Sequence, residues 1–461
     1  MEKTIDNAMM NRRSFLSRFG TGPFAAAAGG LAGFPALADD GTPNAAATEV
    51  AQGIAHAQPK RLIVSAPVLQ NAAERSMGVA FAVSADASGW VEISRSPDMS
   101  GARRVYSGGL GMMEVNDKIA QILVRGLRPA TRYWYRVGAD RIDYQGGYRM
   151  KNLGSETDPK VHSFTTLGAE LNGSFCIIND THERRDALKF TLSKLAELNP
   201  SVVIWNGDVI NKAEDMQRAM NAFIHTHEDF PEYAADTPFM FLNGNHDFRG
   251  RFARHLERVW MFRDHAERSG RFSELGRNFV QRLGDIALIG LDTGEDKPDD
   301  YPAFAGIFQM ERYRDLQTEW LAEEIERPAV KTAKFKVVIC HLPLFHARAD
   351  DPDIPAGDGP IRGRCAAWSR PCAKRWLPIL EKAGVDLVVV GHRHSFHVDE
   401  VTAGRTWMQI VGGGCDPDPK NSKGFPSVVE GRVVDGRLAV NVYSSTTDRI
   451  EFSCMIGETR E

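Results

Sequence analysis

The chain has 461 residues, of which 43% are hydrophobic and 25% are charged, a composition typical of a folded globular protein and unlike that of a disordered chain. Its 56 Lys and Arg residues stand against 60 Asp and Glu residues, so the formal net charge of -4 gives no general attraction toward nucleic acid or an anionic membrane surface. We therefore expect no nucleic acid partner, and an anionic substrate must be met by a local positive site.

The amino-terminal residues 1–38 have the features of an export signal. Arg12 and Arg13 precede a weakly apolar run of small residues and resemble the twin-arginine motif, and the Ala-Leu-Ala run at 36–38 resembles a signal-peptidase site. The run is too short and too rich in glycine for a lasting membrane span, so we expect no stable membrane insertion. The sequence thus predicts a periplasmic or secreted protein handled by the twin-arginine export machinery, while a basic disordered tail is the other interpretation. Because that machinery moves folded proteins, a cofactor would be loaded before export.

Residues 39–60 are rich in Ala, Gly and Pro and are predicted to form a linker, whereas residues 61–168 have the pattern of an all-β domain. Short apolar or alternating runs, separated by Gly, Pro, Asp and Ser, predict strands at 77–85, 89–96, 119–127, 131–138 and 161–167. The stretch from Leu127 to Tyr133 resembles the fibronectin type III signature, in which Tyr133 would be the corner tyrosine. We therefore expect a fibronectin III-like β-sandwich in this region.

In residues 172–461 strands alternate with amphipathic helices, which is typical of an α/β domain. Apolar runs predict strands at 174–180, 201–208, 238–245, 286–292, 334–341 and 385–390, and helical periodicity is present at 184–198, 215–225 and 311–326. Short strands return at 406–413, 427–434 and 437–445 without a boundary, so we keep them in the same domain. The six cysteines are too few for a disulfide scaffold, although Cys365 and Cys372 flank a loop and could pair in an oxidising compartment.

Five of the predicted strands end in side chains of the kinds that bind metal ions. These eight residues are Asp180, His182, Asp208, Asn245, His246, His341, His392 and His394. Each one alone has an ordinary explanation as a polar strand end or as a turn former beside glycine. Because ligands of open α/β sheets bind at the carboxyl ends of the strands, the eight together predict a metal site at one sheet edge.

The order of these motifs, DxH, GD, GNHD, H and GHxH, resembles the calcineurin-like metallophosphoesterase superfamily over roughly residues 172–446. The resemblance implies an α/β fold of four layers, α-β-β-α. A β-sandwich ahead of it is similar to the arrangement of plant-type purple acid phosphatases. The resemblance further implies a metal-dependent phosphoric ester hydrolase with two metal ions per chain, for which the mixed donor set suits Fe, Mn or Zn.

The resemblance also implies a role for each motif residue. One metal ion would be bound by Asp180, His182, Asp208 and His394. The other would be bound by Asp208, Asn245, His341 and His392, so that Asp208 bridges the two ions. The side chain of His246 would assist the leaving group, with Asp247 orienting its ring. We expect His246 not to bind metal, since adjacent side chains on an extended segment point apart.

Two metal ions at such a site make hydroxide available near neutral pH and neutralise charge on the phosphoryl oxygens, so we expect hydrolysis by a metal-bridging hydroxide. Phosphate monoesters are the expected small substrates. Phosphodiesters of the nucleotide or glycerophosphodiester type are the alternative, and a noncatalytic binding scaffold is a third interpretation. Purple acid phosphatases carry a tyrosine three residues after the motif aspartate, where this chain has Asn211, so a purple Fe(III) centre is doubtful. Beside the motifs, Arg249 and Arg393 either contact a phosphate group or are solvated.

Overall fold

The structure is a computed structural model that describes residues 61–457, except for 264–269, 346–368, 416–422 and 447–448. The predicted export signal (1–38), the predicted linker (39–60) and Cys365 lie outside the described residues. Cys372, the other half of the considered disulfide, is a free buried thiol. Within the described part of the chain, no helix is both long and apolar enough to cross a membrane.

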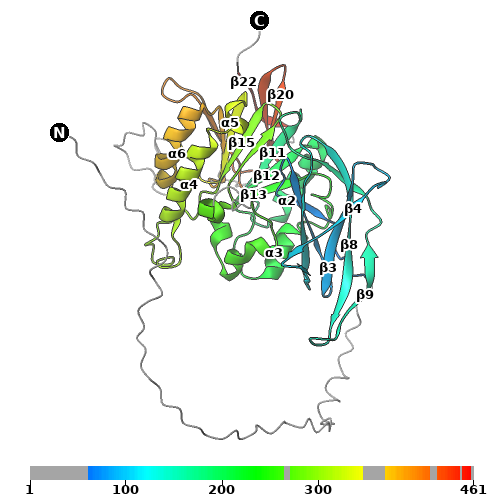
Figure 1. Cartoon of the computed structure of the whole chain (residues 1–461). Coiled ribbons are helices and arrows are strands. Elements are labelled where there is room, and N and C mark those ends of the chain that lie inside the picture. The colour runs from blue at the N-terminus through cyan, green and yellow to red at the C-terminus, as the bar shows by residue number, and fades with distance from the viewer. Residues whose placement is uncertain (1–60, 264–269, 346–368, 416–422, 447–448, 458–461) are drawn as a thin grey trace, which may run out of the picture. The chain divides into compact units, whose positions relative to one another are not determined.

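Two large sheets form the centre of the described structure (Figure 1). The nine-stranded sheet has the order β22 (Ile450–Ile456), β21 (Arg437–Ser444), β20 (Ser427–Val434), β11 (Ser174–Ile178), β12 (Val202–Asn206), β13 (Phe239–Leu242), β1 (Val68–Gln70), β2 (Ser76–Ala82) and β7 (Ile119–Arg125). The six-stranded sheet has the order β14 (Phe279–Leu283), β15 (Ile286–Leu291), β16 (Phe335–Cys340), β17 (Leu387–Val390), β19 (Met408–Val411) and β18 (His397–Asp399). Strands β11, β12 and β13 are parallel, as are β15, β16 and β17.

Helices cover the outer faces of both sheets. Helices α2 (Arg185–Leu198) and α3 (Met216–Phe223) share a buried apolar cluster with β11, β12 and β13. Helices α4 (Met310–Glu324) and α6 (Arg370–Ala383), with the short α5 (Pro328–Lys331), share another with β15, β16 and β17. A third cluster fills the space between the two sheets. The predicted α-β-β-α order of four layers is therefore present.

Local sequence explains why helix α2 forms and where it ends. Leu188, Leu192 and Leu195 recur at helical spacing and are buried against the sheet. The helix ends at Asn199, which takes the left-handed conformation with φ of 45° and donates its backbone N–H to the Leu195 carbonyl. Asparagine tolerates this conformation because its short polar side chain forms local hydrogen bonds.

The amino-terminal β-rich region shares the nine-stranded sheet with the α/β part. Strand β1 pairs in parallel with β13, with Gln70 opposite Phe239. Onto β1, β2 and β7 packs a five-stranded sheet of β10 (His162–Thr165), β8 (Arg132–Tyr144), β3 (Ala87–Ser94), β4 (Arg103–Tyr106) and β9 (Met150–Thr157); β5 (Gly108–Gly109) and β6 (Met112–Met113) form a separate hairpin. The Tyr135 hydroxyl also donates to the Ala235 carbonyl at 2.6 Å. The described residues thus form one compact unit.

The predicted strands of this region are present, and its likeness to fibronectin type III stays a prediction. The phenol oxygen of Tyr133, the expected corner tyrosine, accepts the backbone N–H of Arg128 at 3.0 Å. This bond ties the start of β8 to the turn that precedes it.

Candidate metal centre

The seven predicted metal ligands lie on loops at the carboxyl ends of five strands. Asp180 and His182 follow β11, Asp208 follows β12, Asn245 follows β13, and His341 follows β16. His392 and His394 follow β17, on the loop that leads to β18. The parallel direction of the strands brings all of these loops to one edge of the two sheets, as the sequence predicts.

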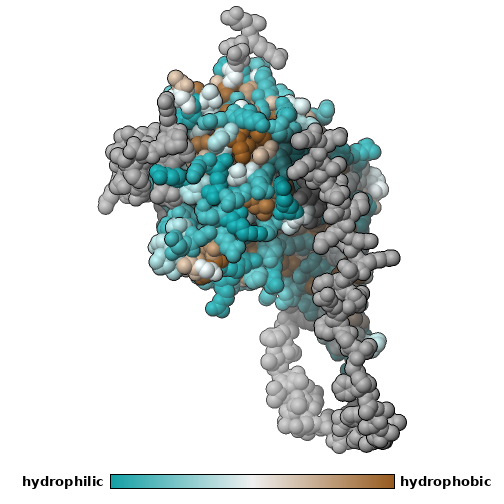
Figure 2. Space-filling view, turned by 60° about the vertical axis from the view of Figure 1, so that its left-hand side comes forward, coloured by the Kyte–Doolittle hydropathy of each residue, from teal (hydrophilic) through white to brown (hydrophobic). Residues whose placement is uncertain are grey.

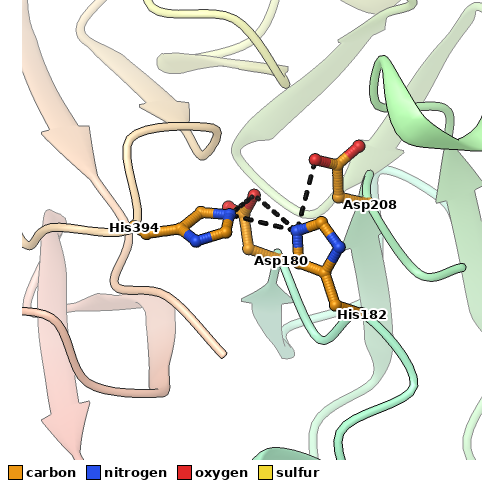
Figure 3. A group of neighbouring side chains, drawn as sticks. All are labelled: Asp180, His182, Asp208 and His394. Atoms are coloured by element: carbon orange, nitrogen blue, oxygen red, sulfur yellow. Dashed lines mark hydrogen bonds and ion pairs between the residues drawn. The ribbon is translucent and has the colours of Figure 1, made fainter. Parts of the chain in front are cut away.

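Four of these side chains form a first cluster (Figure 3). The Nε2 atom of His394 lies 3.2 Å from Asp180 Oδ1 and 3.0 Å from His182 Nε2. The same nitrogen of His182 lies 3.4 Å from Asp208 Oδ2. One donor atom from each of the four residues falls within 4.8 Å of the others, which is the spacing needed to surround one metal ion.

A second cluster shares Asp208 with the first. Its members are Asp208, His341 and His392, whose donor atoms also lie within 4.8 Å of one another. His341 Nε2 lies 3.3 Å from Asp208 Oδ2, and Asn245 brings its Oδ1 to 3.0 Å from His392 Nδ1. Asp208 therefore faces both clusters, which is the position that a bridging ligand requires.

Two buried atoms show that this donor set fits metal ions. Asp180 Oδ1 and His341 Nε2 are fully buried, belong to the clusters and have no hydrogen-bond partner among the residues that the structure describes. Unpaired buried polar atoms are costly, and a cation between the two clusters would compensate both. Imidazole, carboxylate and amide donors together suit Fe, Mn or Zn.

The charges in the clusters shift the pKa values of their members strongly. Burial alone would raise the pKa of Asp208, but the nearby imidazoles of His341 and His182 lower it to about 2. Burial alone would lower the pKa of His341, but Asp208 and Asp180 raise it to about 10. Burial lowers the pKa of His392 to about 4, and the charge of His341 adds to this effect. Asp208 is therefore ionised at neutral pH, and a metal ion bound at His341 would displace the proton from its imidazole.

The backbone of these loops is strained in a consistent way. Asp180, His182, Asp208, His392 and His394 all have φ between 47° and 70°, the left-handed region that non-glycine residues rarely adopt. Such strain is typical of functional sites, where surrounding packing holds it in place. The segment with His392 and His394 is a bend that follows the end of β17. The two imidazoles consequently enter different clusters.

Glycines next to the donors allow the loops to approach closely. A Cβ atom on Gly207 would lie 2.5 Å from His341 Nδ1, and one on Gly244 would lie 2.3 Å from Asp208 Oδ1. Both distances are shorter than real Cβ contacts. The glycines of the GD and GN motifs are therefore required by the packing of the donors.

His246 begins the single turn η1 (His246–Phe248), and its ring meets that of His182 edge-on at 4.8 Å between centroids. Because this turn is helical, the argument that His246 points away from the metal on an extended segment is wrong. Its Nδ1 lies 3.2 Å from the Asn211 carbonyl, and its Nε2 lies 3.1 Å from Arg249 Nη1. With a carbonyl on one side and a guanidinium on the other, the ring is held as the Nδ1–H tautomer. Burial lowers the pKa of His246.

Asp247 does not orient the His246 ring, contrary to the prediction. Its carboxylate accepts backbone N–H groups from Gly244 at 2.7 Å, Asp208 at 2.8 Å and Ile210 at 3.1 Å. Burial, with the adjacent charge of Asp208, raises the pKa of Asp247 to about 8. Asp247 thus joins the loops after β12 and β13 and acts on the site by positioning Asp208.

Two residues near the clusters have roles that the sequence analysis did not assign. Asn211 Oδ1 lies 2.9 Å from His182 Nδ1, and its Nδ2 donates to the His182 carbonyl at 3.0 Å, so Asn211 fixes this imidazole. The buried Glu295 holds Arg249 through two contacts of 3.1 and 3.2 Å. The only signal for Glu295 in the sequence is that it follows the end of β15. It belongs to none of the metal-ligand motifs.

Comparison with known proteins agrees with this geometry. Residues 173–396 match the family model described as calcineurin-like phosphoesterase. The chain therefore contains a calcineurin-like metallophosphoesterase domain, a class whose members typically hold a dinuclear metal centre. A search of curated proteins found no match.

Solved structures support the fold. The chain is similar to purple acid phosphatase PPD1 from yellow lupin seeds, with 14% identity, a TM-score of 0.58, and coverage of 84% of this chain and 73% of that one. At this identity the likeness shows the fold alone. A similarity to GAP50, the anchor in the inner membrane complex of Plasmodium, has 14% identity, covers 63% of this chain and 90% of that one, and has a TM-score of 0.41, too low to carry an argument.

Proposed function

We propose that the protein is an exported, metal-dependent phosphoesterase that hydrolyses small phosphate monoesters. The observation that carries this proposal is the pair of donor clusters that share Asp208 and are flanked by the ring of His246. Two bound cations would activate water and neutralise the charge that grows on the phosphoryl oxygens. All seven predicted ligands are retained, which argues against a noncatalytic scaffold.

The residues around the clusters have separate tasks in this proposal. His182 is oriented by Asn211, and His341 by the Asn206 carbonyl, which lies 2.9 Å from its Nδ1. Hydrogen bonds of this kind fix the ring plane and the tautomer of a ligating imidazole. In this proposal His246 and Arg249, whose Nε2 and Nη1 atoms lie 3.1 Å apart, would face the leaving oxygen of a substrate.

The residue at position 211 bears on which kind of metal centre the site would hold. In the purple acid phosphatase pattern this position carries an iron-binding tyrosine, whereas here the amide side chain is engaged with His182. This supports a colourless centre in place of a purple Fe(III) centre. Phosphodiesters remain the alternative substrates, since the same site would accept them.

Activity is tested with the metal-replete protein on paired aryl phosphate monoesters and diesters that share one leaving group. We expect a higher kcat/KM for the monoester. A higher value for the diester would support the alternative, and no turnover of either would contradict the enzyme assignment.

Export is tested by cell fractionation of the full chain beside an Arg12→Lys, Arg13→Lys variant. We expect the unchanged chain outside the cytoplasm and the variant inside it. Equal cytoplasmic retention of both would contradict the export proposal.

A further inference from the structure

The turn η1 borders a second cavity besides the metal centre. One end of the turn places the ring of His246 against that of His182 in the first cluster, and the other end supplies Phe248 to the wall of a cavity of about 340 Å³. The remaining walls come from η2 (Arg251–Arg258), η3 (Gly270–Leu275) with the residues that follow it, and the segment 307–313 at the start of α4. A volume of this size is at the lower end of the range for small-molecule sites, roughly 300–1,000 Å³.

The cavity carries an excess of positive charge. Three arginines line it, against one carboxylate, Glu274. Arg312 pairs with that carboxylate through two contacts of 2.7 Å. Arg277 lies 3.8 Å from the buried Asp292, at the outer limit of an ion pair. Arg254 has no carboxylate partner among the described residues, so its charge is available to a ligand.

The guanidinium groups of Arg254 and Arg277, which have no close carboxylate partner in the described part of the chain, each lie over an aromatic ring. Arg254 lies over Phe308 at 5.6 Å, and Arg277 lies over Phe248 at 4.8 Å. The two phenyl rings meet edge-on at 6.3 Å between centroids. Exposed Ile307 and buried Met310 extend this apolar wall. One face of the molecule is mostly hydrophilic with small, scattered apolar patches (Figure 2).

We infer that this cavity binds an organic anion: a molecule with a flat aromatic or apolar body and one carboxylate or sulfonate group. The body would pack against Phe308 and the exposed Ile307, and the anionic group would pair with Arg254 and Arg277. A guanidinium favours such planar anions because it presents several donors in one plane. A simple inorganic anion would leave the aromatic wall uncovered, and a neutral arene would leave the charge of Arg254 unused.

The inference concerns binding and does not depend on the proposed phosphoesterase reaction. The cavity and the metal clusters have no lining residue in common, yet both touch η1. The anion could be a separate molecule or the distal part of a substrate. Competition with inorganic phosphate, which occupies phosphate-binding metal centres, distinguishes binding in this cavity from binding at the clusters.

The test uses naphthalene-2-sulfonate, an aromatic anion that is not a phosphate ester, titrated calorimetrically into the metal-replete full chain. We expect saturable binding at one site per chain that persists in saturating inorganic phosphate. Arg254→Gln should weaken binding about tenfold or more, the size of one charge-assisted hydrogen bond. Arg271→Gln is the matched control, because Arg271 does not line the cavity and is paired with Glu323, and it should change the affinity by less than about threefold.

A second variant, Phe308→Leu, keeps the apolar volume but removes one ring face, and it should also weaken binding. The inference is overturned if no saturable binding is found, if inorganic phosphate abolishes binding, or if Arg254→Gln and Arg271→Gln have equal effects.

Discussion

The amino-terminal β-rich region and the α/β layers share one nine-stranded sheet, but their loops differ in kind. In the β-rich region the left-handed residues Asn71, Met99, Leu110 and Ala130 lie at turns or loops that carry no donor cluster. At the carboxyl edge of β11, β12 and β17, five left-handed residues are the candidate metal ligands themselves. In these ligand loops, backbone strain is offset by buried contacts such as those of Asp247.

We therefore expect function to depend on the ligand loops and stability to depend on the core of the β-rich region. Substitutions in the ligand loops should change turnover or metal affinity with a smaller effect on unfolding. Substitutions in the core of the β-rich region should change the free energy of unfolding and leave the ratio of kcat values for different substrates alone.

The largest effect is expected from Asp208→Asn, which removes the charge shared by both clusters. Turnover should fall by more than the roughly 10⁴-fold that a single acid–base group contributes. Steady-state kinetics and circular dichroism measure activity and fold together. Near-normal activity in this variant would contradict the claim that the ligand loops carry the activity.

His246→Ala should retain both metal ions, since His246 belongs to neither donor cluster. Esters with poor leaving groups should be slowed by roughly 10²–10⁴-fold, because assistance to the leaving oxygen by His246 and Arg249 matters most when that oxygen is basic, and activated aryl esters should be slowed far less. Exposed His255, on η2, offers the control variant His255→Ala. Equal slowing of both ester types would argue against a role at the leaving group.

In the β-rich region, Phe81→Ala should lower the free energy of unfolding by about 3–5 kcal/mol, as for other buried phenylalanines. Phe81 is fully buried in the cluster that also fills the space between the two large sheets. Because β1 joins the two regions through β13, one cooperative transition is expected in urea. A separate early transition confined to the β-rich region would show that it unfolds independently.

Asn211→Leu should weaken metal binding at the first cluster by roughly 10–100-fold, the usual cost of removing a hydrogen bond to a ligating histidine. Asn211→Asp keeps an acceptor toward His182 Nδ1 and should restore much of the affinity. Chelator competition measures both variants. Unchanged affinity in Asn211→Leu would mean that the contact with His182 is passive.

The smallest effect concerns Asp236, which links the two regions through His162 and the backbone of Ser163. Burial raises the pKa of this carboxyl, but these hydrogen bonds lower it more. A lowered pKa in the folded state contributes stability above the unfolded value of about 3.9, and this stability is lost as pH falls below it. The difference in urea midpoint between the unchanged protein and Asp236→Asn should therefore be constant at neutral pH and shrink in acid. A difference that grows in acid would contradict this sign.

Local patterns were sufficient to predict much of the fold and the candidate donors. Apolar runs such as the one before Asp180 mark buried strands, and polar residues after them mark the sheet edge. Strand β1 could not be predicted, because three residues are too few to show a period. Its pairing with β13 joins segments far apart in the chain.

The hydrogen-bond partners of the site residues were also beyond local patterns. Asp247 follows His246 directly, which suggested a contact between them, but the folded loops give its carboxylate three backbone amides instead. Asn211 was noticed only as a missing tyrosine. Its contact with His182 depends on how the loops after β11 and β12 lie against each other.

The central claim is that the two clusters sharing Asp208 hold metal ions. Elemental analysis of the protein, matured through its own export route, tests this most directly. We expect two equivalents of Fe, Mn or Zn per chain, with a clear loss in Asp208→Asn. A total well under one metal per chain in the unchanged protein would contradict the account.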